Sequence, residues 1–240
     1  MSAALVTGAG QGMGAAIAAR LASDGHDVAV NDIVAENARA VAERTGGTAY
    51  PFDVSDPDAA AAAVAAIGDV DILVANHAYM TMAPFEATTP EDWARTIDVN
   101  LLGTATLIEL TAPGMVERGF GRIVVIASEW GVIGWPNATS YAASKGGLIA
   151  LVKSAARALG PRGVAVNAIA PGITDTPQLQ VDADDAGVSR AEIVERYAAD
   201  IPLGRVGSPE DIAEVVAFLC SEPAIALVGQ VIQPNGGTTR

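Results

Sequence analysis

Two side chains with complementary acid–base chemistry, Tyr141 and Lys145, lie four residues apart in a segment of helical composition, Tyr141–Leu159. Residues four apart on a helix share one face, with Cβ atoms about 5–6 Å apart. A free tyrosine has a pKa of about 10, which is too high for a base at neutral pH, but a neighbouring ammonium favours the phenolate and lowers that pKa. The pair is therefore a candidate general acid and base for an alcohol or a ketone.

A glycine-rich turn, Thr7–Gly14 (TGAGQGMG), lies between the first expected strand and the first expected helix. A bound phosphate needs close approach to the backbone and free N–H groups at a helix N-terminus, which side chains would obstruct. Gly10, Gly12 and Ala15 match the dinucleotide spacing G-x-G-x-x-[GA]. Asp32 ends the second strand, where a carboxylate can accept hydrogen bonds from an adenosine ribose. These residues predict a dinucleotide site; the alternative is a turn that serves packing only.

Asp32 also bears on which dinucleotide binds. A 2′-phosphate about 4 Å from its carboxylate would cost up to about 4 kcal/mol at an effective dielectric constant near 20. Between Gln11 and the end of the second strand the one cation is Arg20, well down the first helix, and Arg39 lies a turn or more into the next helix. We therefore expect NAD rather than NADP.

Short apolar runs alternate with longer helical patterns along the chain. This alternation is typical of an α/β fold of the Rossmann type, a doubly wound parallel sheet with helices on both faces. The seven expected strands are Ala3–Thr7, Asp27–Asp32, Thr48–Phe52, Val70–Ala75, Arg122–Ala127, Val164–Ala170 and Gln230–Gln233. The expected helices are Gly12–Asp24, Ala35–Arg44, Asp56–Ile67, Pro90–Leu110, Tyr141–Leu159 and one from Ser208 to about Cys220.

No linker or change in composition divides the sequence, so residues 1–240 are expected to form one domain. One segment, 174–200, interrupts the alternation with Pro177, Gly187 and many polar residues. An irregular or partly helical excursion of this length is usually functional or mobile.

The chain is strongly acidic, with 14 Lys and Arg against 28 Asp and Glu and a net charge of −14. Nucleic acids and anionic membranes reward Lys and Arg, so neither is expected as a partner. The single cysteine, Cys220, excludes an internal disulfide and a thiolate metal cage, and no metal site is expected. The N-terminus does not resemble a signal peptide, and no segment approaches the ~20 consecutive apolar residues of a membrane span. A soluble cytoplasmic protein is expected.

Several spaced motifs carry a resemblance. TGAGQGMG, a strand ending in IVVIAS, then YAASK and NAIAPG resemble the short-chain dehydrogenase/reductase family in its short, single-domain branch. The resemblance covers nearly the whole chain, through PLGRVGSPEDIAEVVAFL and the terminal GQVIQPNGG. Motifs in this order are more specific than any one of them alone.

The resemblance implies roles for individual residues. Tyr141 would be the catalytic acid and base, and Lys145 would lower its pKa and bind the nicotinamide ribose. Ser128 would orient the substrate oxygen, and Asn100 in DVNLLG would support a proton-relay water next to Lys145. The implied cofactor-binding residues are Gly8, Gln11, Gly12, Met13, Gly14, Asp32, Asp53, Val54, Asn76, Tyr141, Lys145, Pro171, Gly172, Thr174 and Thr176.

One motif departs from the family's pattern. The family often has Asn-Asn-Ala-Gly after the fourth strand, where this chain has Ala75-Asn76-His77-Ala78. Asn76 keeps its place, whereas His77 replaces a small residue and Ala78 replaces the glycine. His77 is either a substrate or proton group, or a histidine that only packs at the strand end.

The substrate site is expected to include Ser128, Glu129, Trp130, Tyr141, Trp135 and Tyr79, covered by the segment 174–200. Trp130 and Trp135 are either walls of this site or packing residues. Residues 175–200 carry seven acids and two arginines, a net charge of −5, which disfavours a multiply anionic substrate unless both arginines point inward. Carboxylates accept hydrogen bonds from hydroxyls, which favours a sugar, a polyol or a small hydroxy ketone. The alternative is that these acids face solvent.

The expected function is thus an NAD-dependent oxidoreductase acting on CH–OH groups. A 3-oxoacyl carrier-protein reductase is the first alternative; it normally uses NADPH and a basic docking patch, for which Arg118, Arg122, Arg157 and Arg162 are candidates. A non-catalytic nucleotide-binding regulator on the same fold is the second. The family resemblance further implies a homotetramer, for which small-residue surfaces are available at Ala142, Ala143, Gly146, Gly147, Ala150 and Ala155, and at Ala213, Val216 and Ala217.

Overall fold

Within residues 2–239, which the computed structural model describes, seven parallel strands form one sheet in the order β3-β2-β1-β4-β5-β6-β7. The strands are β1 (Ala3–Val6), β2 (Asp27–Val30), β3 (Thr48–Ala49), β4 (Ile72–Ala75), β5 (Gly121–Ile126), β6 (Val164–Ile169) and β7 (Val231–Ile232). β4, β5 and β6 are buried along their whole length, which explains why their residues are mostly apolar, with Arg122 and Asn167 as buried exceptions. The predicted doubly wound parallel sheet is confirmed.

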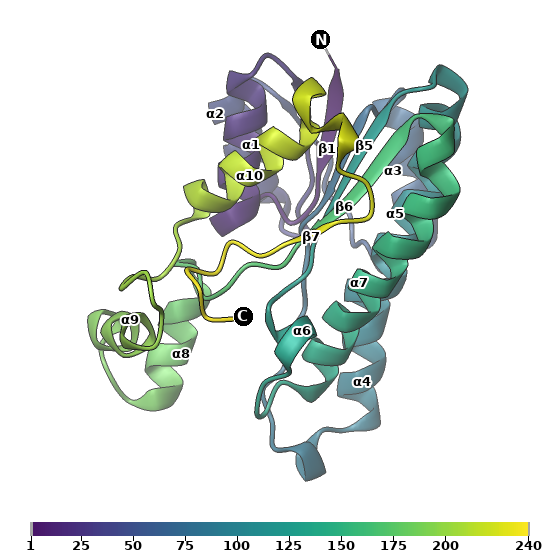
Figure 1. Cartoon of the computed structure of the whole chain (residues 1–240). Coiled ribbons are helices and arrows are strands. Elements are labelled where there is room, and N and C mark those ends of the chain that lie inside the picture. Colours follow the sequence, from purple (N-terminus) through teal and green to yellow (C-terminus); the bar gives the residue numbers. More distant parts are fainter. Residues whose placement is uncertain (1, 240) are drawn as a thin grey trace.

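Helices cover both faces of this sheet (Figure 1). One face packs against α1 (Gly12–Ser23), α2 (Ala35–Thr45) and α10 (Pro209–Cys220). The other packs against α3 (Pro57–Ile67), α5 (Gly103–Arg118) and α7 (Thr139–Leu159). The strand order reverses between β1 and β4, and in such sheets ligands bind at the carboxyl ends of the strands beside this reversal.

Two helices begin at capping boxes that the sequence indicates. Thr89 accepts a hydrogen bond from the Asp92 backbone N–H, and the Asp92 carboxylate accepts one from the Thr89 backbone, at the start of α4 (Pro90–Ile97). Ser208 and Asp211 form the same arrangement at α10. These reciprocal bonds satisfy backbone donors that the first helical turn otherwise leaves free.

The helix that the sequence predicts over Pro90–Leu110 extends to Arg118 in the structure. α4 continues through a π-helical turn (Asp98–Leu102) directly into α5, which ends at Arg118. Pro113 does not end α5, because Ala112 and Met115 beside it are buried in the core. By length and composition alone Pro90–Arg118 could cross a membrane, but half of its apolar window is buried inside the fold, as in the core helix of a folded domain.

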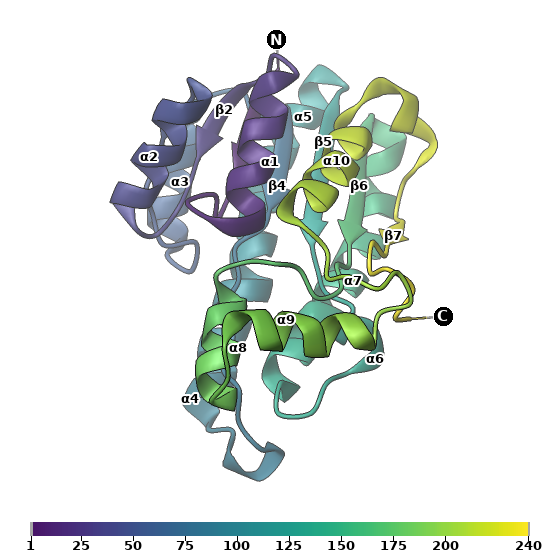
Figure 2. The same cartoon turned by 90° about the vertical axis from the view of Figure 1, so that its left-hand side faces the viewer.

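The segment 174–200 folds into two short helices, α8 (Gln178–Ala186) and α9 (Arg190–Ala199), around a small apolar cluster of their own. Figure 2 shows them beyond the carboxyl ends of the strands, across from the short α6 (Trp130–Ile133). Short 3₁₀ turns complete the chain at Phe85–Ala87, Gly160–Arg162 and Glu222–Ala226. The excursion is therefore ordered as a helical cover over the end of the sheet where ligands are expected.

Candidate active site

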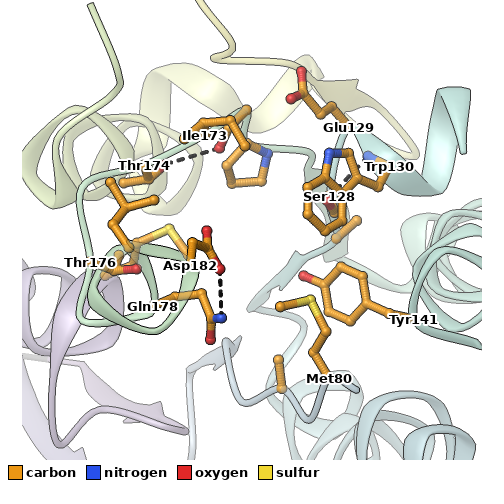
Figure 3. A pocket seen from close by; sticks show the side chains of 16 residues that line it. Met80, Ser128, Glu129, Trp130, Tyr141, Ile173, Thr174, Thr176, Gln178 and Asp182 are labelled. Atoms are coloured by element: carbon orange, nitrogen blue, oxygen red, sulfur yellow. Dashed lines mark hydrogen bonds between the residues drawn. The ribbon is translucent and has the colours of Figure 1, made fainter. Parts of the chain in front are cut away.

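Ser128, Tyr141 and Lys145 come together at the carboxyl end of β5. Ser128 follows β5 directly, whereas Tyr141 and Lys145 lie on the first turns of α7. Ser128 and Tyr141 line the same cavity, and their side chains face it in Figure 3. The Lys145 side chain lies behind them, 1% exposed, and its Nζ donates a hydrogen bond to the Ile126 carbonyl at 2.7 Å. The structure thus brings together three of the four residues of the predicted catalytic set, the fourth being Asn100.

The acid–base properties of this pair differ from the sequence expectation. Burial raises the pKa of Tyr141 to about 12, and a hydrogen bond from Ser128 is the interaction that lowers it. Burial also lowers the pKa of Lys145 to about 7. The Lys145 Nζ lies 5.5 Å from the centroid of the Tyr141 ring and is bonded to the backbone. Although the two residues share one helix face, Lys145 does not lower the pKa of Tyr141 as expected. Burial disfavours the charged form of both groups.

Asn100 occupies the π-helical turn and joins two segments of the site. Its Oδ1 accepts a hydrogen bond from the Tyr79 backbone N–H at 2.7 Å. Its Nδ2 donates to the Tyr79 carbonyl and to the Ser144 Oγ, both at 2.9 Å. Both ends of the amide are thus occupied by the loop after β4 and by α7, so the side chain positions these two elements.

The glycine-rich turn and the strand ends around it form a second cavity next to the first. Of the residues implied by the family resemblance, it is lined by Gly8, Gln11, Asp32, Asp53, Val54 and Asn76. The first cavity is lined by Met13, Pro171, Gly172, Thr174 and Thr176 together with Ser128 and Tyr141. Twelve of the fifteen predicted cofactor residues therefore line two adjoining cavities, whereas Gly12, Gly14 and Lys145 line neither.

The backbone of the glycine-rich turn, with Asn76 beside it, forms a cradle that fits a dinucleotide. A Cβ atom on Gly14 would lie 2.2 Å from the Gly8 carbonyl oxygen, so only glycine permits this approach. Gly12 has a φ of +53°, in the left-handed region that favours glycine. Among the described residues, the Oδ1 atom of Asn76 is buried without a hydrogen-bond partner while its Nδ2 donates to the Thr7 and Gly8 carbonyls. A buried free acceptor at the cradle requires a donor that a bound ligand can supply.

The Asp32 carboxylate is held by two backbone donors. Its Oδ2 accepts from the Gly10 N–H and its Oδ1 from the Val34 N–H, each at 2.9 Å. Asp32 is 9% exposed and lines the second cavity. A fixed carboxylate at this place matches the predicted contact with the ribose hydroxyls.

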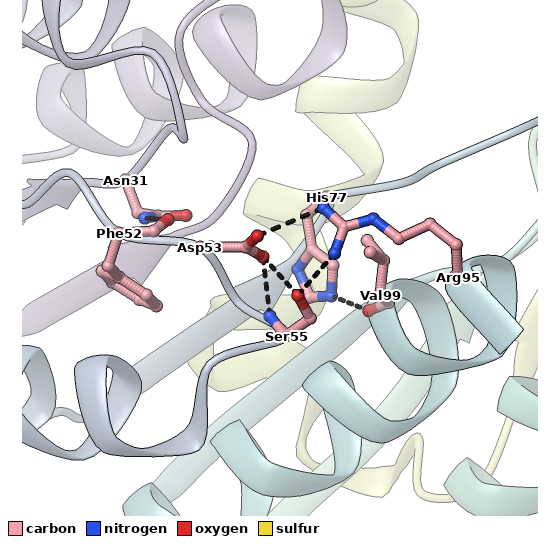
Figure 4. Close-up of polar contacts among 7 residues, drawn as sticks. All are labelled: Asn31, Phe52, Asp53, Ser55, His77, Arg95 and Val99. Carbon is pink, nitrogen blue, oxygen red and sulfur yellow. Dashed lines mark hydrogen bonds and ion pairs between the residues drawn. The ribbon is translucent and has the colours of Figure 1, made fainter.

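Arg95 is a residue of this cavity that the sequence reasoning missed (Figure 4). Its guanidinium donates to Asp53 Oδ2 at 3.1 Å and to Ser55 Oγ at 3.0 Å. Burial raises the pKa of Asp53, but hydrogen bonds from Ser55 and Arg95 outweigh this effect and lower it. Arg95 carried no motif signal, because it reaches Asp53 from α4, 42 residues along the chain.

His77 connects the end of β1 with the π-helical turn (Figure 4). Its Nε2 lies 3.1 Å from the Val99 carbonyl, which can only accept, so the proton is on Nε2 and the Nδ1 accepts from the Thr7 hydroxyl at 2.7 Å. Burial, with a smaller effect from Lys145, lowers the pKa of His77 to about 3. The residue is therefore a neutral, hydrogen-bonded link inside the fold, which favours the packing interpretation.

Three expected substrate residues lie differently from their predicted places. Tyr79 lines the second cavity and not the first. The Arg95 guanidinium carbon lies over its ring, 5.8 Å from the ring centroid. Trp135 lies behind Trp130 and stacks on it. Glu129 borders the first cavity, but its carboxylate points away in Figure 3 and accepts from the Thr238 hydroxyl at 2.5 Å. Trp130 does line the cavity, as one alternative predicted.

The acids of the segment 175–200 are mostly turned outward. Asp182 lines the cavity and is half-buried, whereas the six others are exposed. Both arginines bond to acids of the same segment: Arg190 to Asp175 at 2.5 Å, and Arg196 to Glu192 at 2.6 Å. The solvent-facing alternative is therefore correct for six of the seven acids, and neither arginine lines the cavity.

Comparison with known proteins places the chain among enzymes. Residues 8–239 match the family model described as enoyl-(acyl carrier protein) reductase. A short-chain dehydrogenase/reductase from Armillaria gallica is 41% identical over 246 residues, covering 98% of this chain and 94% of that protein. The 3-oxoacyl-[acyl-carrier-protein] reductase FabG from Aquifex aeolicus is 39% identical, covering 97% and 95%. An acetoacetyl-CoA reductase from Rhizobium meliloti is 38% identical, covering 98% and 97%.

A solved structure described as a short chain dehydrogenase/reductase family protein superposes with a TM-score of 0.91 at 33% identity, covering 98% of this chain and 96% of the other. The fold is thus shared with this family over nearly the whole chain. This chain belongs to the short-chain dehydrogenase/reductase family of oxidoreductases, whose members use a nicotinamide dinucleotide.

Proposed function

We propose that the protein is an NAD-dependent oxidoreductase that interconverts a secondary alcohol and a ketone. The observation that carries this proposal is the cavity in which Ser128 and Tyr141 face the same space, with Lys145 behind them and the glycine cradle adjoining. A non-catalytic nucleotide binder does not need this arrangement.

Each residue has a defined task in that reaction. NAD, when bound, accepts the hydride from the carbinol carbon. The Tyr141 phenolate accepts the hydroxyl proton as the ketone forms, and the Ser128 hydroxyl donates a hydrogen bond to the same substrate oxygen. Protonated Lys145 has three N–H donors, of which one is bonded to Ile126, so two are free for a ribose.

The preference for NAD over NADP rests on Asp32. Its carboxylate is fixed by two backbone N–H groups at the edge of the cavity. Among the described residues that line this cavity the one cation is Arg95, which is bonded to Asp53. A 2′-phosphate beside Asp32 would therefore meet a negative charge without a free cation to balance it.

We further propose a small, neutral, hydroxylated substrate. No Lys or Arg is found among the described residues that line the first cavity. The phosphate groups of a phosphate ester or of an acyl-CoA would therefore lack a counter-charge there. The net charge of −14 likewise opposes nucleic acid and anionic membranes as partners.

The names of the FabG and acetoacetyl-CoA reductase relatives favour a second candidate, reduction of a 3-oxoacyl thioester. Of the possible docking cations, Arg118 is bonded to Asp69 and Asp71, and Arg122 is buried. Arg157 lies 16 residues beyond Tyr141 on α7, about 24 Å along the helix. Arg157 is thus remote from the Tyr141 hydroxyl.

The test is turnover by the wild-type protein of neutral secondary alcohols, polyols and ketones, and of acetoacetyl-CoA, each with NAD(H) and with NADP(H). We expect kcat/KM to be at least about tenfold higher with NAD(H) and higher for neutral substrates. A preference for acetoacetyl-CoA with NADPH would support the second candidate. NADH binding without turnover of any substrate would support a non-catalytic binder.

A further inference from the structure

The part of the first cavity beyond Tyr141 has two unlike walls (Figure 3). One is apolar and includes Trp130 and Met80, near the catalytic hydroxyls. The other comes from α8 and presents Gln178 and Asp182 across the cavity. The cavity has a volume of about 260 Å³, and the predicted cofactor residues line part of it, so the space left suits a small molecule.

The Trp130 indole is a rigid surface. Trp135 stacks on it with ring centroids 5.0 Å apart and an angle of 4° between the planes. The Tyr141 ring meets it at 81° with a centroid distance of 6.0 Å. An indole held on two sides beside the reacting oxygen offers a flat apolar contact that a ring fits better than a flexible chain, because a ring loses less conformational freedom on binding.

Asp182 is the one acid of the segment 175–200 that both lines the cavity and is half-buried. Its Oδ1 accepts from Gln178 Nε2 at 3.0 Å, and its Oδ2 accepts from the Tyr197 hydroxyl at 3.3 Å. Each carboxylate oxygen can accept more than one hydrogen bond, so both retain capacity for a hydroxyl donor. The carboxylate is thus held in place and still able to bind a polar group.

We propose that the cavity selects a neutral ring that carries a hydroxyl near the reacting carbon, a cyclic hydroxy ketone or the corresponding cyclic diol, with the ring on Trp130 and the hydroxyl donating to Asp182. This inference rests on the proposed oxidoreductase function and names its substrate class. Such a molecule would contact both the apolar wall and the Asp182 carboxylate, whereas an open-chain ketone without a hydroxyl would offer neither a flat ring nor a donor.

Helix α8 supplies a matched control for Asp182. Gln180 Nε2 donates to Asp184 Oδ1 at 2.8 Å, the same i to i+4 pairing as Gln178 with Asp182, but Asp184 is exposed. Asp182→Asn and Asp184→Asn therefore remove one charge from equivalent pairs on the same helix, one at the cavity and one in solvent.

The measured quantity is the ratio of kcat/KM for NADH-dependent reduction of 2-hydroxycyclohexanone to that of cyclohexanone. We expect this ratio to exceed about 10 in the wild-type protein and to fall about tenfold in Asp182→Asn, because a charge-assisted hydrogen bond is lost. It should stay within about twofold in Asp184→Asn, with both variants showing a cooperative melting transition. A ratio that does not change between wild type and Asp182→Asn, or that falls equally in both variants, would overturn the role of Asp182.

The ring contact is tested by NAD-dependent oxidation of cyclohexane-1,2-diol against hexane-2,3-diol. We expect the wild-type protein to prefer the cyclic diol, Trp130→Leu to lose most of that preference, and Trp130→Phe to keep part of it, since a flat ring remains. Equal use of the two diols by the wild-type protein would refute the ring preference while leaving the oxidoreductase function intact. Absence of turnover with every neutral and acyl substrate would instead refute the function itself.

Discussion

At the residue scale, Tyr141 is the group on which the chemical step depends most. We expect Tyr141→Phe to reduce kcat by at least about 10³-fold, because the hydroxyl that moves the proton is lost. The ring and its contact with Trp130 remain, so the Kd for NADH should change by no more than a few-fold. Steady-state kinetics and a fluorescence titration of NADH measure the two quantities. Comparable turnover by the variant and the wild type would disprove the assignment.

The pH dependence of alcohol oxidation should report the same group. Burial raises the pKa of Tyr141 to about 12 and Ser128 lowers it, so the phenolate that oxidation requires becomes more abundant as pH increases. We expect kcat/KM for oxidation to rise with pH across the alkaline range. In Ser128→Ala the rise should move to higher pH, since the hydrogen bond that favours the phenolate is gone. An unshifted profile in the variant would contradict this.

The buried Lys145 should lower the free energy of unfolding by an amount that depends on pH. Burial lowers its pKa to about 7, against 10.5 for the free group, so between these values the unfolded chain binds the proton more strongly than the folded one. The wild-type protein therefore gains stability from this residue's titration as pH rises from about 7 to 10.5 and carries the full penalty below that window. We expect Lys145→Met to have its largest advantage in Tm at pH 6 and to lose that advantage towards pH 10. A Tm difference independent of pH would exclude this explanation.

At the element scale, the junction between β1 and α1 depends on one glycine contact. A methyl group at Gly14 would lie 2.2 Å from the Gly8 carbonyl oxygen and 2.6 Å from the Asn76 amide nitrogen. We expect Gly14→Ala to weaken NADH binding at least about tenfold and to lower Tm, because backbone cannot give way as a flexible side chain can. Isothermal titration and thermal melting measure both effects.

The control is Gly114→Ala in α5, where the added methyl meets no backbone and only the Arg118 guanidinium at 3.0 Å, a side chain that can shift while keeping its bonds to Asp69 and Asp71. A helix interior gains about 1 kcal/mol from replacing glycine with alanine, so this variant should bind NADH normally and be at least as stable. If both variants bind NADH like the wild type, the cradle does not depend on this contact.

The π-helical turn (Asp98–Leu102) positions neighbouring elements of the site through two of its residues. The π-helical turn carries Asn100, whose amide joins the loop after β4 to α7, and neighbouring Val99 accepts from His77. A single π turn within an otherwise α-helical stretch commonly marks a functional position. The unusual His77 at the end of β4 therefore fits the neighbouring turn, which explains how this chain departs from the family's usual small residue there.

At the scale of the whole molecule, assembly depends on what the surface exposes. The expected contact surface on α10 is wrong, because Ala213, Val216 and Ala217 are all buried within the chain itself. On α7, Ala143 and Ala150 are exposed, while the other small residues named there are partly buried.

Larger apolar side chains are exposed elsewhere on the surface. Leu102 (52% exposed) ends the π-helical turn that precedes α5, and Phe218 (50%) and Ile225 (54%) lie at the end of α10 and just beyond it. Because α5 and α10 cover opposite faces of the sheet, two separate twofold contacts would generate a tetramer. We expect light scattering to give about four times the chain mass of 24.3 kDa, and Phe218→Asp to reduce it. A monomer at micromolar concentration would contradict the tetramer.

The sequence by itself determined the order of strands and helices, the glycine turn and the Tyr141–Lys145 spacing. These features depend on local rules: hydrophobic periodicity, capping residues such as Thr89, and the backbone freedom of glycine at Gly12. The uninterrupted apolar run in Arg122–Ala127 likewise indicated a strand buried on both faces. Each of these signals is contained within a few neighbouring residues, so no knowledge of distant contacts was needed to interpret it.

Only the tertiary structure decided which side chains face the substrate. Glu129 turns towards Thr238, 109 residues away, and Arg95 reaches Asp53 across 42 residues. Asp182 was one of seven similar acids until the packing of α8 against the cavity separated it from the others. Burial likewise set the pKa values of Tyr141 and Lys145, because desolvation depends on everything that surrounds a group and not on its neighbours in sequence.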